Sequence, residues 1–381
     1  MTRWLGTFAL LMTLATPGLA AGQTRLSLAD AIARAQTQNL DARSAEAARR
    51  QAMQRVTQAR AGFLPSVEAS GSWQRGNQPV FVFSALLAQR HFAASNCAID
   101  ALNRPDAVGN LRTALTVEQA VFDPLTRPAV RAATLAHEVA TVTRARLGQD
   151  LAVAVTAAYG AVLSAEAART AAGAALETAT ADLDLSRNRR DAGVVTDADV
   201  LQLEVSLARA REQQIRTGAD VTISRARLNE VIGEPLDAAF DLEDLPDPAP
   251  LADSALAALE GAALAERPDV KLAALREQLA GSELDAARAA FLPRVTAHAG
   301  WEANGGTWSP PSSSWVVGAA AHVSLFRGFA DRARVVEAQE QQSQRALEHF
   351  AMAAFEEMVI AEHHRVASHA AGAGGHVGHL A

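Results

Sequence analysis

A fifteen-residue motif occurs twice in this 381-residue chain, and each copy marks a change of secondary structure. ARAGFLPSVEASGSW covers residues 59–73 and ARAAFLPRVTAHAGW covers residues 287–301, with nine identical positions. In both copies an alanine- and arginine-rich segment of high helix propensity ends at a proline, Pro65 or Pro293, after which apolar and polar residues alternate. The motif therefore predicts two places at which a helix passes directly into a strand, and its repetition indicates a tandem duplication.

The alternating segments predict four strands of about ten residues, in hairpins at about 65–122 and 293–326. Val67, Ala69 and Trp73 alternate with polar residues, and most aromatic residues of the chain lie in or beside these segments. A transmembrane β-barrel requires such two-faced strands with aromatic ends. The alternative is a pair of half-buried hairpins in a soluble protein. Because four strands leave two open edges in lipid, the membrane interpretation requires several copies of the chain, and three copies would supply twelve strands.

The N-terminus predicts export from the cytoplasm. Residues 1–21 combine Arg3, an apolar run and small residues before a cleavage point near Ala20 or Ala21, as secretory signal peptides do. Beyond them no apolar run of about eighteen residues is evident, so we predict no membrane-spanning helix. The single Cys97 cannot form an intramolecular disulfide, and it is either a small buried or loop residue or a reactive thiol. The net charge of −7 disfavours a nucleic-acid partner.

A long stretch follows the first hairpin, with proline only at its first residue, Pro128. Residues 128–191 predict a helix of about 96 Å, Gly193 interrupts it, Thr196 can cap a second helix, and Gly233 can end that helix. This arrangement predicts an antiparallel coiled coil, although an ordinary helical spacer would show the same periodicity. The seam of the returning helix, at alternating spacings of three and four, consists of Val200, Leu203, Leu207, Ala210, Gln214, Thr217, Val221, Ser224, Leu228 and Val231.

Several short segments, taken in order, resemble the TolC-like outer-membrane efflux protein family. FLPSV and FLPRV precede the first strand of each copy, and LTVEQAVFD and HVSLFRG stand where the second strand passes into helix. RRDAGVVTDADVLQLEVSLARAR, residues 189–211, spans the hairpin turn, and RPDV at 267–270 opens the second half. Each segment is weak alone, but their order and the duplication are specific, and together they span roughly residues 26–345.

The resemblance implies a mainly α fold with a small β part. Each protomer would contribute a long antiparallel coiled-coil hairpin and four transmembrane strands to a trimeric twelve-stranded barrel with a helical tunnel. Such proteins are passive exit ducts for efflux or type I secretion, located in the cell outer membrane with helices extending into the periplasm. Implied partners are two further copies of the chain in a homotrimer, a periplasmic adaptor (membrane fusion) protein, an inner-membrane pump and outer-membrane lipid.

Two sets of site residues follow from the resemblance. The hairpin tip would contact the adaptor, and the unpaired amide groups at the helix start after Thr196 would be offered to that partner. The alternative for the tip is plain turn chemistry. The tip set is Arg190, Ala192, Gly193, Val194, Val195 and Thr196, and the helix-to-strand junctions are Phe63, Leu64, Pro65, Phe291, Leu292 and Pro293.

The predicted organisation has four parts. A signal peptide at 1–21 precedes a first repeat at 22–250, an incomplete second repeat at 251–349 and a His/Gly-rich tail at 350–381, with a proline-rich linker at 236–254. Relative to the second repeat, the first carries 24 extra residues, about 84–107, which we expect to form a polar loop.

The second half departs from the family pattern. Only 55 residues follow Phe326, whereas the first long hairpin takes about 110, so the second hairpin is expected to be missing. The tail is expected to be disordered or the product of truncation or a frameshift. Metal binding is the alternative, through His363, His364, His369, His376 and His379.

No spacing typical of an enzyme active site, phosphate loop or metal centre occurs in the sequence, so we predict neither catalysis nor a cofactor. The leading prediction is a passive channel. A soluble periplasmic coiled-coil adaptor or scaffold and a truncated, non-functional channel remnant are the alternatives. The exported substrate and the partner pump are not specified by the sequence.

Overall fold

The computed structural model describes residues 24–245, 267–306 and 311–374. The predicted signal peptide and the second half of the proline-rich linker, from residue 246 onward, lie outside these ranges. The chain forms two compact units, each assembled from two separate segments: Met1–Arg43 with Gly148–Ala249, and Ser44–Leu147 with Pro250–Ala381. These units do not coincide with the two sequence repeats, because the first repeat supplies residues to both of them.

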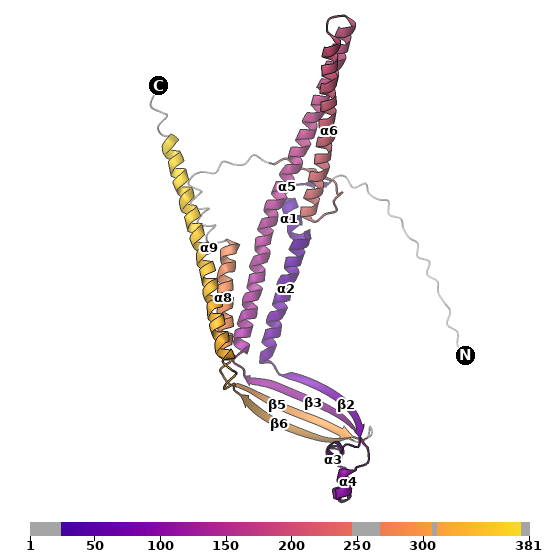
Figure 1. The fold of residues 1–381 in the computed structure, drawn as a ribbon, viewed down its shortest axis with the longest axis vertical. Coiled ribbons are helices and arrows are strands. Elements are labelled where there is room, and N and C mark those ends of the chain that lie inside the picture. The colour runs from indigo at the N-terminus through magenta and orange to yellow at the C-terminus, as the bar shows by residue number, and fades with distance from the viewer. Residues whose placement is uncertain (1–23, 246–266, 307–310, 375–381) are drawn as a thin grey trace, which may run out of the picture. The chain divides into compact units, whose positions relative to one another are not determined.

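The first unit is built around a long helical hairpin. Its elements are β1 (Thr24–Leu26), α1 (Leu28–Gln38), the later part of α5 (Thr126–Asp191), α6 (Asp197–Ile232) and β4 (Phe240–Leu242) (Figure 1). Helix α5 has 66 residues and is therefore about 99 Å long. Strands β1 and β4 pair in parallel, with Thr24 opposite Phe240.

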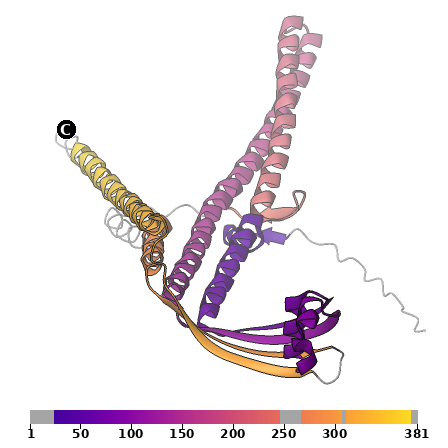
Figure 2. The ribbon, with the colours of Figure 1, turned by 60° about the horizontal axis from the view of Figure 1, so that its bottom comes forward.

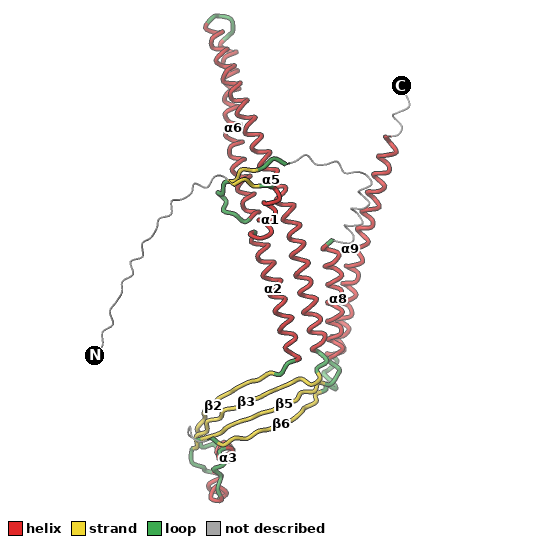
Figure 3. The backbone as a smooth tube through the Cα atoms, turned by 180° about the vertical axis from the view of Figure 1, so that it is seen from behind, coloured by secondary structure: helices red, strands yellow, loops and turns green. Residues whose placement is uncertain are grey.

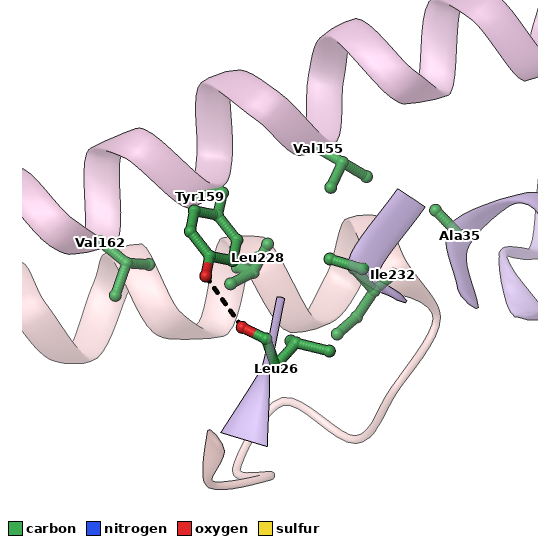
Figure 4. Packing of buried hydrophobic residues seen from close by; sticks show 8 residues of the cluster. Leu26, Ala35, Val155, Tyr159, Val162, Leu228 and Ile232 are labelled. Carbon is green, nitrogen blue, oxygen red and sulfur yellow. Dashed lines mark hydrogen bonds between the residues drawn. The ribbon is translucent and has the colours of Figure 1, made fainter. Parts of the chain in front are cut away.

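The core of this unit gathers around Tyr159 (Figure 4). This side chain is fully buried on α5, beside Leu228 and Ile232 of α6 and Leu26 of β1. Its hydroxyl lies 2.8 Å from the carbonyl oxygen of Leu26 and 2.7 Å from that of Glu243, so one hydroxyl proton is shared between two carbonyl acceptors. Burial raises the pKa of Tyr159, which keeps the hydroxyl protonated as a donor.

The helix boundaries of the hairpin follow local capping chemistry. Thr196 caps α6, and Gly233 ends it in the left-handed conformation at φ +81°, as the sequence predicts. Of the ten predicted seam positions, nine are buried or half-buried, and Gln214 is exposed. Near the turn the seam residues Val200 and Leu207 pack with Leu183 of α5.

The segment of high helix propensity before Pro65 contains two helices. Helix α1 ends at Gln38, and α2 (Leu40–Arg60) begins after Asn39. The side-chain oxygen of Asn39 accepts hydrogen bonds from the amides of Asp41 (2.8 Å) and Ala42 (3.4 Å), while its side-chain nitrogen donates to the carbonyl of Val231 (2.9 Å). Asparagine thus caps the second helix and ties the break to the end of α6, a contact that helix propensity alone does not reveal.

The second unit contains the sheet and its flanking helices. Its four strands are β2 (Ser66–Gly76), β3 (Val108–Phe122), β5 (Arg294–Gly305) and β6 (Ser312–His322). Its helices are most of α2, the first part of α5, α8 (Pro268–Ala289) and α9 (Ala330–Gly374). The strands form where the alternation predicts them, and both predicted hairpins, β2–β3 and β5–β6, are present. They join in one antiparallel sheet, in the order β2-β3-β5-β6 (Figure 3). The pairing of β3 with β5 joins the two repeats.

The segment expected to be a polar loop between β2 and β3 is largely helical. It forms α3 (Pro79–Ala88), a short 3-10 helix at Ala94–Cys97, and α4 (Ile99–Asn103). Pro79 starts α3 at a position that proline favours, and Val82 and Ala85 are buried. The rings of Phe83 and Phe92 stack edge to face at 5.0 Å. The loop expectation is therefore wrong, because apolar side chains in the segment pack with one another.

Helix α9 corrects the expectation of an irregular tail from about Phe350. It packs against α8 and continues to Gly374, through His363, His364 and His369 (Figure 1). His376 and His379 lie outside the described residues, as do the side chains of the other three. Alanine and glutamate, which favour helix, outweigh the histidines as far as Gly374.

One further expectation needs correction. Within α5 an 18-residue window is long and apolar enough, by length and composition alone, to cross a membrane. Only 22% of that window is buried in the chain, although Val155, Tyr159 and Val162 of the same helix are fully buried in the hairpin core.

Candidate functional site

The four-stranded sheet has one apolar face and one polar face. The strand register places Ala69, Leu115, Trp301 and Trp315 in one row across the sheet. The row beside it on the same face consists of Val67, Val117, Ala299 and Val317. Trp315 is 77% exposed and Val317 is 68% exposed, so this face is uncovered apolar surface of the chain.

The opposite face carries polar rows and a hollow of about 300 Å³. One row is Ser70, Ala114, Glu302 and Ser314, and the next is Ser72, Arg112, Asn304 and Ser312. The guanidinium of Arg112 donates to Glu302 at 2.7 Å, and the side-chain amide of Asn304 donates to the other oxygen of Glu302 at 3.3 Å. The residues of this face that line the hollow include Thr116, His298 and Gly300.

Both outer edges of the sheet are open in the chain. Among the described residues β2 pairs only with β3, and β6 pairs only with β5. Adjacent strands alternate in direction, and their number is even, so β6 of one copy would run antiparallel to β2 of a neighbouring copy. The edges therefore fit repeated pairing between copies of the same chain.

The predicted junction residues lie where helix gives way to strand. Pro65 stands between Leu64 and the first residue of β2, and Pro293 stands between Leu292 and the first residue of β5. Before each proline a short turn closes, with the amide of Leu64 donating to the carbonyl of Ala61 and that of Leu292 to the carbonyl of Ala289. Phe63, Leu64, Phe291 and Leu292 are each about half exposed or more, so both junctions present apolar side chains at one end of the sheet.

The predicted tip residues form the turn between α5 and α6. Gly193 adopts φ +72°, its amide donates to the carbonyl of Arg190 (2.8 Å), and that of Val194 donates to the carbonyl of Arg189 (2.9 Å). This pair of bonds is a Schellman motif, which requires the left-handed residue. Val194 is 72% exposed, whereas Val195 is half-buried.

Charges around the tip are matched by neighbours in the same turn. Arg190 donates to Asp191 at 2.8 Å and lies 4.0 Å from Asp197. The hydroxyl of Thr196 donates to Asp199 and accepts from its amide, and this bonding lowers the pKa of Asp199. The expectation that the α6 start offers its amides to a partner is therefore wrong for Asp199, whose amide is capped by Thr196. What the turn presents outward is the apolar side chain of Val194.

Sequence reasoning missed a chain of polar contacts at one end of the sheet. Gln89, at the end of α3, is 4% exposed and donates to the side chain of Asn110, which in turn donates to Asn304. The polar character of these positions is visible in the sequence, but their meeting depends on the pairing of β3 with β5 and on the fold of the segment between β2 and β3.

This combination of a small two-faced sheet, helices continuing from its strands and a long helical hairpin is the fold of outer-membrane channels. The CmeC outer membrane channel of Campylobacter jejuni matches with a TM-score of 0.66 and 15% identity, over 85% of this chain and 67% of that one. The outer membrane protein VceC of Vibrio cholerae matches with a TM-score of 0.65 and 18% identity, over 86% and 75%.

The sequence itself belongs to the family described as Outer membrane efflux protein, whose sequence model matches residues 31–234 and 259–356. We therefore assign the chain to the outer membrane. Protein CyaE of Bordetella pertussis is 31% identical over 252 residues, covering 64% of this chain and 52% of the relative. The chain thus spans about half the length of this curated relative. The family is one of channels, not a class of enzymes.

Proposed function

We propose that the chain is the subunit of a passive outer-membrane channel, the exit duct of a tripartite efflux or type I secretion system. The observation that carries the proposal is the two-faced sheet with open edges, in a member of the outer membrane efflux protein family. The exposed apolar face suits contact with lipid, and the polar face suits a water-filled lumen. A soluble adaptor would instead expose this apolar face to water.

The open edges argue for a closed ring of copies. In lipid an unpaired strand edge leaves amide and carbonyl groups without partners, which costs several kcal/mol per group. Three copies joined β6 to β2 would close twelve strands, an even number within the range of known barrels. In such a homotrimer the long α5–α6 hairpins would form coiled coils that line a periplasmic tunnel. An inner-membrane pump would supply the energy.

Reconstitution in a planar bilayer tests the channel function. Purified full-length protein is expected to give discrete, long-lived conductance steps, because a closed ring of paired strands would keep the lumen open without a ligand. A correctly folded trimer that never conducts would contradict the proposal and favour a non-functional remnant. A protein that is fully extracted without detergent would favour the soluble scaffold.

Labelling of the single Cys97 tests the orientation of the chain in the outer membrane. Cys97 is exposed and lies between β2 and β3, at the end of the sheet away from the junction prolines. A membrane-impermeant maleimide is expected to label Cys97 on intact cells. In a Cys97→Ser background, Val194→Cys at the hairpin tip is expected to react only after the outer membrane has been permeabilised. The reverse pattern would contradict the assigned orientation.

We further propose that the hairpin tip contacts a periplasmic adaptor through Val194 and its neighbours Arg190, Ala192, Gly193, Val195 and Thr196. The support is the exposure of Val194 in a turn where Arg190 is paired with Asp191 and Asp199 is bonded to Thr196. A photo-cross-linking residue at Val194 is expected to yield an adduct that mass spectrometry identifies as an adaptor. The same residue at Ile215 is the matched control, because Ile215 is 75% exposed but lies about 30 Å along α6 from the turn. Equal adducts at both positions would exclude a specific tip contact.

A further inference from the structure

The end of helix α3 is fixed to three strands of the sheet. The side-chain amide of Gln89 donates to the carbonyl of Gly109 at 2.8 Å and to the side-chain oxygen of Asn110 at 2.9 Å, both on β3. The hydroxyl of Ser312 on β6 donates to the carbonyl of Gln89 at 2.9 Å. Asn110 extends the contact to β5 by donating to Asn304 at 2.9 Å. Because these polar groups bond to one another, they hold the end of α3 in one position on the sheet.

The attachment lies on the polar face of the sheet. Asn110 and Asn304 share that face with Arg112 and Glu302, and the bonds from Asn304 and Arg112 to Glu302 continue the network along it. Gln89 and Asn304 are 4% and 2% exposed, so the end of α3 covers this part of the face. Arg90 adds a bond from its guanidinium to the carbonyl of Ser313 at 3.0 Å.

The location along the strands is equally defined. Strand β2 ends at Gly76 and β3 begins at Val108, and Asn304 and Ser312 flank the turn between β5 and β6. The attachment is therefore at the end of the sheet opposite Pro65 and Pro293, where α3 stands over the strand ends (Figure 2). In the orientation proposed above, this is the outer end of the barrel.

We propose that the segment from Pro79 to Asn103 is a constriction at the outer mouth of the channel, held over the lumen by Gln89, and that it limits the size of solutes that pass. This inference rests on the proposed function, since only a barrel with the polar face inside places α3 across the lumen. Gln89 acts as a positioning residue: it touches no solute, and it holds the helix that does. Pore diameter is a principal determinant of passage through such a channel.

The test is the conductance and size limit of Gln89→Met channels. Methionine keeps the length of the side chain but removes both donated hydrogen bonds. We expect single-channel conductance to rise about twofold, and larger polyethylene glycols to enter and block the current, because the mouth is wider. Ser343→Ala is the control: Ser343 is on α9, outside the proposed constriction, its hydroxyl donates to Gln339 of the same helix, and its loss should change neither quantity.

The outcomes separate the two proposals. If no version of the chain conducts, the channel function itself is refuted. If wild-type channels conduct and Gln89→Met channels have the same conductance and the same polymer limit, the constriction is refuted. If Gln89→Met does not form trimers, Arg90→Ala replaces it in the test. This substitution removes only the exposed hydrogen bond to Ser313, so a smaller rise in single-channel conductance is expected, and no rise would refute the constriction.

Discussion

Leu115→Arg is expected to abolish membrane assembly, whereas Thr116→Arg, one residue away, is expected to be tolerated. Leu115 lies in the apolar row between Ala69 and Trp301, and Thr116 lies on the polar face. An arginine on the lipid face near the bilayer midplane costs about 2–4 kcal/mol, and every copy in the ring would bear that cost. On the lumen face the same side chain remains in water.

The measurement is the amount of detergent-extracted trimer in the outer-membrane fraction, with both variants expressed at equal level. Loss of Leu115→Arg trimer beside near-normal Thr116→Arg trimer is the expected pattern. The opposite pattern would mean that the faces are assigned the wrong way round. Equal tolerance of both substitutions would favour half-buried hairpins outside lipid.

The second large effect is expected at Gly233, where alanine should destabilise the first unit by about 2–5 kcal/mol. Its left-handed backbone costs a non-glycine residue about 1–2 kcal/mol. A β-carbon would also lie 2.6 Å from the carbonyl carbon of Gln38 and 2.7 Å from the amide nitrogen of Asn39. Both are backbone atoms, so the α1–α2 break must move away, which adds about 1–3 kcal/mol.

Gly193→Ala separates these two contributions. Gly193 has nearly the same backbone conformation, at φ +72°, and ends its helix with the same motif, but a β-carbon there meets nothing within 4 Å. Thermal unfolding followed by far-ultraviolet circular dichroism should show a clearly larger loss for Gly233→Ala. Limited proteolysis should also cut near Asn39 in that variant alone. If both substitutions lower the unfolding temperature equally, the close approach of the α1–α2 break to Gly233 contributes nothing to the loss of stability.

The parts of the fold that were predictable from sequence are those set by local chemistry. Proline, glycine and threonine placed the boundaries of α6 and the starts of β2 and β5, because each acts through its own backbone or its immediate neighbours. The alternation of apolar and polar residues likewise placed the strands, because the side-chain period of a strand is two.

What could not be predicted depends on distant contacts. The break at Asn39 is tied to Val231, and the helical character of the segment after β2 depends on the packing of Phe83 with Phe92 and on Gln89 reaching the sheet. For the same reason the sequence revealed the position of the hairpin tip but not the capping of the Asp199 amide. It also revealed two hairpins but not the β3–β5 pairing that joins them.

The parallel pairing of β1 with β4 has a consequence for the order of events during export. Thr24 has no strand partner until Phe240 has emerged, so β1 stays unpaired while the whole of α5 and α6 emerges. Closing a loop of about 215 residues costs about 5 kcal/mol of chain entropy. Burial of Leu26 and its contact with the Tyr159 hydroxyl offset that cost only once the α5–α6 hairpin exists. Until the α5–α6 hairpin is complete, the β1 segment is therefore accessible to chaperones and proteases.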